Sequence, residues 1–158
     1  MEFRNFFVFD LGGVTGSVSS ASMRVQSYAV TANGTYTLYR TSLPASIAGD
    51  CVGCESTFAG LVAGPPLGSI ALGPGSSNGT LSIPLNDAAI AWLGASAGGT
   101  VVIGGAFPQP ADADNYAFGY SGFDAGNELV LNAVPEPGTL LLLGSGVAAL
   151  ALRRRRRA

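Results

Sequence analysis

Short runs in which apolar and polar residues alternate, separated by Gly, Pro, Asn and Asp, recur along most of the chain and most constrain its fold. Residues 3–11 are rich in aromatics, and Met23 and Val25 alternate with Arg24 and Gln26. A period of two is typical of strands with one face in a core. Comparable patterns occur at residues 35–40, 81–85, 100–103, 116–120 and 129–132. We therefore predict at least seven short strands.

These strands predict an all-β body, an antiparallel β-sandwich, and among sandwiches we favour the jelly roll over the immunoglobulin-like arrangement. Residues 6–25 also resemble the first two strands of secreted jelly-roll modules in bacterial surface proteins. Asn33-Gly34 predicts a hairpin between residues 21–28 and 35–40. The Gly- and Pro-rich residues 64–79 predict a long surface loop.

One short helix is predicted in the body, at residues 87–95. Asn86 is a suitable N-cap, and Gly98-Gly99 follows the expected end. Helical spacing turns Ile90 and Leu93 inward, and we expect the single Trp92 to be buried beside them. Pro84, just before this helix, is expected in an edge strand, because it donates no ladder hydrogen bond.

The chain contains no His and no Lys, so all eight basic residues are Arg. Ser-His-Asp and Cys-His nucleophile systems, Schiff bases and lysine-dependent phosphate loops are therefore excluded. We expect a protein that is not an enzyme and needs no cofactor.

Charge is divided unevenly along the chain. Five of the eight arginines form one run at the C-terminus, residues 153–157, while residues 1–134 contain three arginines and nine acidic residues, a net charge of −6. Such asymmetry suggests that the two parts have different roles. We divide the chain into a sandwich body, residues 1–133, and a C-terminal segment, residues 134–158. An arginine-rich nucleic-acid tail is disfavoured, because the arginines follow an apolar run without aromatic partners.

The C-terminal segment has three consecutive parts. Pro135-Glu136-Pro137-Gly138 prevents helix continuation and favours an extended entry. Residues 138–152 are uncharged and apolar on every side, including Leu140, Leu141, Leu142 and Leu143. The basic run follows: Arg153, Arg154, Arg155, Arg156 and Arg157. We predict a short apolar helix of about 22 Å at 1.5 Å per residue, which enters the membrane with its arginines on the cytoplasmic side.

This segment resembles the PEP-CTERM sorting signal of Gram-negative bacteria. The resemblance implies that a membrane-embedded exosortase recognises Pro135, Glu136, Pro137 and Gly138 and cleaves near them. It also implies a transient inner-membrane anchor, and then release to the cell surface or the extracellular space. Such proteins occur in species that make exopolysaccharide or biofilm matrix.

The resemblance further implies an N-terminal signal peptide. The apolar run at residues 6–9 is too short for a signal h-region of 7–15 residues, and no small-residue cleavage site follows it. We therefore expect the true start of the protein to lie upstream of Met1; the alternative is that the protein is not exported as written.

Cys51 and Cys54 form a C-x-x-C pair. A local disulfide fits an oxidising compartment, although so short a loop gains little stability. A redox pair, half of a zinc site and two free thiols are the alternatives.

Asp112 and Asp114 offer carboxylate oxygens for Ca²⁺, but their spacing does not fit the EF-hand loop. A solvated turn is the simpler interpretation. The same acids could also serve as the catalytic pair of a glycosidase, which needs two carboxylates about 5–9 Å apart.

The sequence thus predicts a non-enzymatic exported protein of the surface or extracellular matrix, linked to exopolysaccharide or biofilm. The alternative is a carbohydrate-binding or adhesive module. A secreted hydrolase ranks third.

Overall fold

Seven strands and several short helices make up the part of the chain that the structure, a computed structural model, describes: residues 2–48, 55–108 and 126–134. The strands are β1 (Glu2–Asp10), β2 (Ser17–Gln26), β3 (Gly34–Arg40), β4 (Pro66–Leu72), β5 (Thr80–Pro84), β6 (Thr100–Pro108) and β7 (Glu128–Val134). The helices are α1 (Glu55–Gly60) and α2 (Asp87–Ala95), with 3-10 turns at Ala45–Ala48 and Pro74–Ser76.

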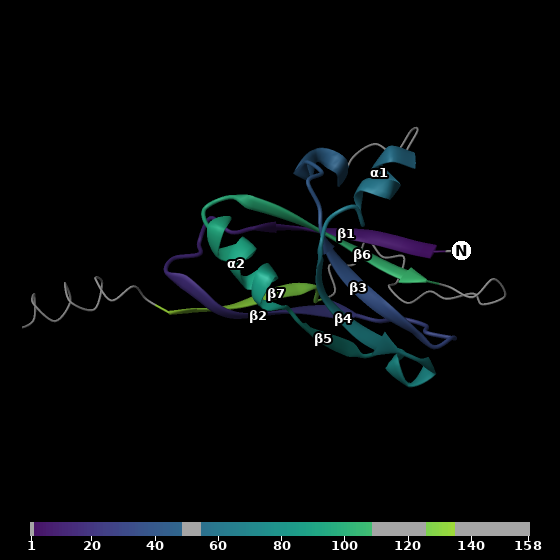
Figure 1. Ribbon diagram of the computed structural model, residues 1–158. Coiled ribbons are helices and arrows are strands. Elements are labelled where there is room, and N and C mark those ends of the chain that lie inside the picture. Colours follow the sequence, from purple (N-terminus) through teal and green to yellow (C-terminus); the bar gives the residue numbers. More distant parts are fainter. Residues whose placement is uncertain (1, 49–54, 109–125, 135–158) are drawn as a thin grey trace, which may run out of the picture.

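The strands form two antiparallel sheets (Figure 1). The four-stranded sheet has the order β1-β6-β3-β4, and the three-stranded sheet has the order β5-β2-β7. This arrangement confirms the predicted all-β, sandwich-like body. The finer assignment to a jelly roll stays a prediction.

The core lies between the two sheets and follows the alternation in the sequence. In β2, Met23 and Val25 are 0% and 1% exposed, while Arg24 and Gln26 face solvent. Side chains from both sheets meet there; the largest fully buried ones are Tyr36, Phe107, Met23, Leu38, Leu67, Ile83, Leu93 and Ile103. Each such apolar side chain contributes about 1.5–3 kcal/mol on burial.

Strand β6 is buried on both faces. Residues 101–107 are all buried, because β1 and β3 flank the strand and the chain around Leu61 covers its outer face. Two glycines leave room for the groups that pack against β6. A Cβ on Gly104 would overlap the carbonyl of Leu61, and one on Gly105 would overlap the Tyr36 hydroxyl.

Helix α2 forms as predicted. The side chain of Asn86 accepts a hydrogen bond from the Ala89 amide at 2.9 Å, and its amide donates to the Pro66 carbonyl at 2.9 Å. Ala89 and Leu93 are fully buried and pack the helix onto the core beside β2 (Figure 1). We expected Trp92 to be buried, and it is only half-buried.

The predicted hairpin at Asn33-Gly34 is wrong. Strand β2 lies in the three-stranded sheet and β3 in the four-stranded sheet, so the chain crosses between sheets here. Val30 is buried during the crossing. Gly34 already pairs with Leu72, and a Cβ on it would meet the Phe107 ring, so close packing rather than a turn requires this glycine. Residues 6–25 likewise span both sheets, because β1 and β2 are not neighbours.

The predicted surface loop at residues 64–79 is also wrong, because residues 66–72 form the edge strand β4. They pair with β3 across a register shift at Leu38/Tyr39, and Leu67 and Leu72 enter the core. Strand β5, by contrast, contains Pro84 and is an edge strand as predicted.

We predicted one helix in the body, and the structure adds α1, which lies next to β1 and β6 (Figure 1). The predicted strand at residues 116–120 and the predicted C-terminal apolar helix lie outside the described residues. Among the described helices, none has the length and apolarity needed to cross a membrane.

Candidate functional site

Strand β7 pairs with β2 from Glu128 to Val134, with a register shift between Val18 and Ser20. Val134 pairs with Ser17, and Ala133 pairs with Val18. Next to this pairing, the Asn132 amide donates a 2.7 Å hydrogen bond to the Ser20 hydroxyl. The C-terminal end of β7 lies on the side of the sandwich away from the label N (Figure 1). The strand therefore holds the chain in place up to the residue before Pro135.

A second feature is a pocket of about 360 Å³ where the end of β3, the loop that follows it, α2 and the start of β6 meet. Its walls carry Arg40, Thr41, Ser42, Trp92, Ser96 and Thr100, and Val101 and Val102 add apolar surface. The Arg40 guanidinium lies over the Trp92 ring, 5.4 Å from the ring centroid. This combination of an aromatic face, a cation and hydroxyl groups can bind a small polar molecule.

The polar groups of this pocket differ in availability. Thr41 is 8% exposed and its hydroxyl accepts from the Leu43 amide, while the Ser96 hydroxyl donates to the Trp92 carbonyl. Ser42 and Thr100 are exposed. The pocket therefore combines fixed polar groups with hydroxyls that face solvent.

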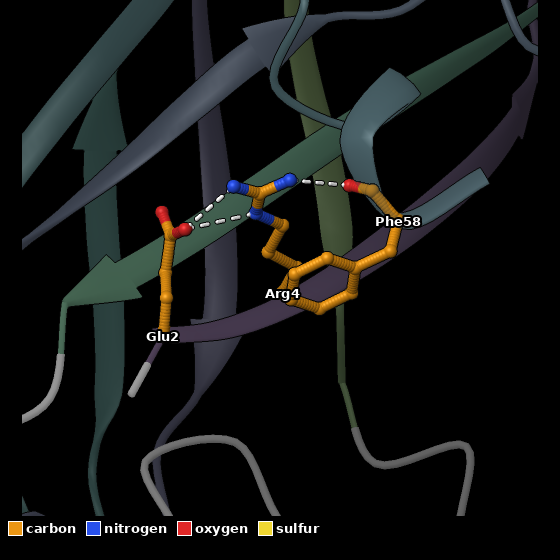
Figure 2. Close-up of polar contacts among 3 residues, drawn as sticks. All are labelled: Glu2, Arg4 and Phe58. Atoms are coloured by element: carbon orange, nitrogen blue, oxygen red, sulfur yellow. Dashed lines mark hydrogen bonds and ion pairs between the residues drawn. The ribbon is translucent and has the colours of Figure 1, made fainter. Parts of the chain in front are cut away.

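The Arg4 cluster, which consists of Glu2, Arg4 and Phe58, fastens α1 to β1 (Figure 2). The Arg4 guanidinium forms an ion pair with Glu2 at 2.6 Å and donates to the Phe58 carbonyl at 2.5 Å. It also lies 4.3 Å from the centroid of the Phe58 ring. Arg4 is thus fully engaged, and its role is to hold α1 in place.

Tyr36 is the described group with the most perturbed ionisation. Burial raises the pKa of its hydroxyl far above the usual value. The hydroxyl donates a 2.7 Å hydrogen bond to Oδ1 of Asn5, across Gly105. This neutral, partly buried pair joins β3 to β1 across β6, which lies between them, so its role is structural.

Comparison with known families adds one finding. The model of the PEP-CTERM protein-sorting motif matches residues 133–156. The chain carries a PEP-CTERM sorting motif. The motif implies a protein that is exported, sorted by an exosortase and directed to the membrane or cell surface. No curated protein and no solved structure is significantly similar to the chain.

The PEP-CTERM motif begins inside the folded body. Its first two residues, Ala133 and Val134, are the last two of β7. The predicted recognition residues Pro135 to Gly138, the apolar leucines and the five arginines fall within the matched range or just after it, and they lie outside the described residues. Cys51, Cys54, Asp112 and Asp114 also lie outside them, so the disulfide and Ca²⁺ hypotheses stay predictions.

The pocket residues were missed in the sequence. Trp92 was assigned to the core, and Arg40 was given no role. A usable signal was present, because Arg40 is one of only three arginines in the body and ends an aromatic strand. The local sequence pattern could not predict that the chain brings α2 next to the end of β3.

Proposed function

We propose that the protein is a non-enzymatic component of the cell surface or extracellular matrix, released or transferred there after an exosortase acts at its C-terminus. The observation that carries the proposal is the continuity between the sandwich and the sorting motif at Ala133-Val134. An acidic body joined directly to a cleavable sorting signal suits a protein whose body is the part that is exported. The absence of His and Lys from the sequence supports a role that does not depend on His- or Lys-based catalysis.

In this proposal each part of the C-terminus has one task. Pro135, Glu136, Pro137 and Gly138 are recognised by the exosortase. Residues 138–152 hold the substrate in the inner membrane as a short transmembrane helix, and the five arginines keep its end in the cytoplasm. The body then contributes to a biofilm or exopolysaccharide matrix.

The test is fractionation of the native host expressing wild type or a triple variant, Pro135→Ala, Glu136→Ala and Pro137→Ala. The wild-type body should appear at the surface or in the medium, and the triple variant should stay in the membrane fraction. Thr15→Ala, an exposed change in the β1–β2 connection, is the control and should behave as wild type. Release of the triple variant at the wild-type rate would refute the assignment of these residues.

A second candidate function is carbohydrate binding, which the Arg40–Trp92 pocket favours. Aromatic faces and hydroxyl groups are the chemistry with which proteins hold sugar rings. A glycan array probed with the purified chain tests this function, and binding to no glycan would count against it.

We also propose that the body is a jelly roll. Successive strands β1, β2 and β3 alternate between the two sheets, as a double-sheet Greek-key arrangement requires. An experimental structure with eight strands in two four-stranded sheets would support the assignment, and any other strand count would reject it.

A further inference from the structure

The three arginines of the body differ in their partners. Arg4 pairs with Glu2 at 2.6 Å, and Arg24 pairs with Glu128 at 3.4 Å. Within residues 2–48, 55–108 and 126–134, Arg40 has no carboxylate within ion-pair distance. In a body of net charge −6, a cation that has no carboxylate partner among these described residues can attract an anion from solution.

The charge of Arg40 lies at the wall of the pocket, next to an aromatic ring. Leu38, two residues earlier, is fully buried, whereas Arg40, the last residue of β3, is exposed, so the row of inward side chains ends at Arg40. There the guanidinium lies 5.4 Å from the centroid of the Trp92 ring and borders the pocket of about 360 Å³. Contact with the ring orients the guanidinium and leaves its N–H donors for a ligand.

Trp92 supplies the second half of the site. The indole is half-buried and packs against the core, so it is a rigid platform rather than a mobile surface side chain. A rigid aromatic face costs little conformational entropy on binding. The exposed hydroxyls of Ser42 and Thr100 add hydrogen-bonding groups at the pocket wall.

We propose that this pocket binds an acidic sugar residue, a uronic acid unit of a polysaccharide. The carboxylate is held by Arg40, the apolar side of the sugar ring lies against the part of the Trp92 indole that the guanidinium and the core leave uncovered, and the sugar hydroxyls bond to Ser42 and Thr100. The inference rests on the second candidate function above, carbohydrate binding, and names its ligand class.

Competing ligand classes fit the site less well. A neutral sugar leaves the charge of Arg40 unused. A nucleic acid needs several cations in a row, whereas the pocket wall has one arginine in a body of net charge −6. A single carboxylate beside an apolar ring matches the one arginine and the indole of the pocket wall.

The single Trp of the chain lies in the proposed site and serves as a reporter. The purified full chain is titrated with trigalacturonate and, in parallel, with the neutral trisaccharide galactotriose, while Trp fluorescence is followed. We expect a saturable fluorescence change with trigalacturonate and at least tenfold weaker binding of galactotriose, because only the first ligand forms the charged hydrogen bonds. Equal affinity for the two would overturn the proposal, and so would no response to either.

Two variants complete the test. Arg40→Gln should weaken trigalacturonate binding about tenfold, and Arg24→Gln, which removes the same charge from an exposed arginine outside the pocket, should leave it unchanged. An equal effect of the two variants would mean that only overall charge matters and would reject the site. Because binding is measured on purified protein, a failure here is separate from a failure of export.

Discussion

Gly104 and Gly105 occupy positions in β6 where no larger residue fits. Substituting either of them should therefore destabilise the fold. Gly104→Ala places a Cβ against the backbone of Leu61, which cannot move without displacing the chain after α1. We expect a loss of about 2–3 kcal/mol in the free energy of unfolding, the upper range for overpacking. Urea unfolding followed by circular dichroism measures it.

The matched control is Gly94→Ala in α2, where a Cβ meets no described atom within 4 Å. Since Ala is the better helix former, this variant should gain about 0.5–1 kcal/mol. If both variants shift stability in the same direction, the close packing of β6 is not as described.

Tyr36 predicts how stability depends on alkaline pH. Its folded-state pKa is raised by burial, so above about pH 10, the ordinary pKa of Tyr, the unfolded state loses a proton that the folded state keeps. Stability contributed by Tyr36 is therefore complete below pH 10 and falls above it, by up to about 1.4 kcal/mol per pH unit.

Tyr36→Phe should remove this part of the alkaline loss, at a cost of about 1 kcal/mol at neutral pH for the hydrogen bond to Asn5. Unfolding free energies at pH 8 and pH 11 measure both effects. Tyr28→Phe, at a tyrosine that is 60% exposed, is the control and should keep the wild-type slope. An unchanged slope in Tyr36→Phe would contradict the assignment.

The sequence predicted individual residues well where burial alternates strictly, as at Met23 and Val25. It failed for Arg40 and Trp92, because their contact depends on which strand end faces α2. That proximity comes from strand order, which no local pattern encodes.

At the scale of elements, Asn86 joins α2 to β4 through both atoms of its amide. Asn86→Ala removes the cap and the hydrogen bond to Pro66, and it should cost about 1–2 kcal/mol. Asn86→Ser keeps a cap acceptor and loses only the second bond, so it should cost clearly less. Thermal unfolding of both variants checks this order, and a greater loss in Asn86→Ser would contradict it.

Helices and strands were predicted correctly where the hydrophobic pattern agreed with the capping and turn residues, and wrongly where the two disagreed. Asn86, the inward Leu93 and the end at Gly98 all indicated α2. At β4, the proline and glycine content of residues 65–68 outweighed Leu67, although β3 pairing and core contacts stabilise the strand. At Asn33-Gly34, a strong turn signal lies on a crossover between sheets, because hairpin preference is local and sheet membership is not.

The junction between β7 and the sorting motif predicts how the folded body affects processing. Because Val134 is paired with Ser17, no spacer separates the sandwich from Pro135. Inserting Gly-Ser-Gly-Ser between Val134 and Pro135 should speed processing several-fold, since the enzyme then approaches without the sandwich next to it. Pulse-chase labelling in the native host measures the rate.

The control is the same insertion after Gly12, in the exposed β1–β2 connection, where a Cβ on Gly13 meets no described atom within 4 Å. It should leave the rate unchanged. Slower processing with the junction insertion would mean that the enzyme uses the folded end of the sandwich as part of its recognition surface.

For the whole molecule, the net charge of −2 describes neither of its parts. Five arginines and much of the apolar sequence belong to the C-terminal segment, and residues 1–134 have a net charge of −6. Removal of the C-terminal segment, as we propose, would leave an acidic body. Net charge of this size favours solubility, which fits the secreted matrix component proposed above.

The account rests on removal of the C-terminal segment, which mass spectrometry of the protein from its native host measures directly. The extracellular fraction should yield a C-terminal peptide that ends near Pro135-Glu136-Pro137 and lacks Arg153 to Arg157. An extracellular protein intact through Ala158 would contradict the account.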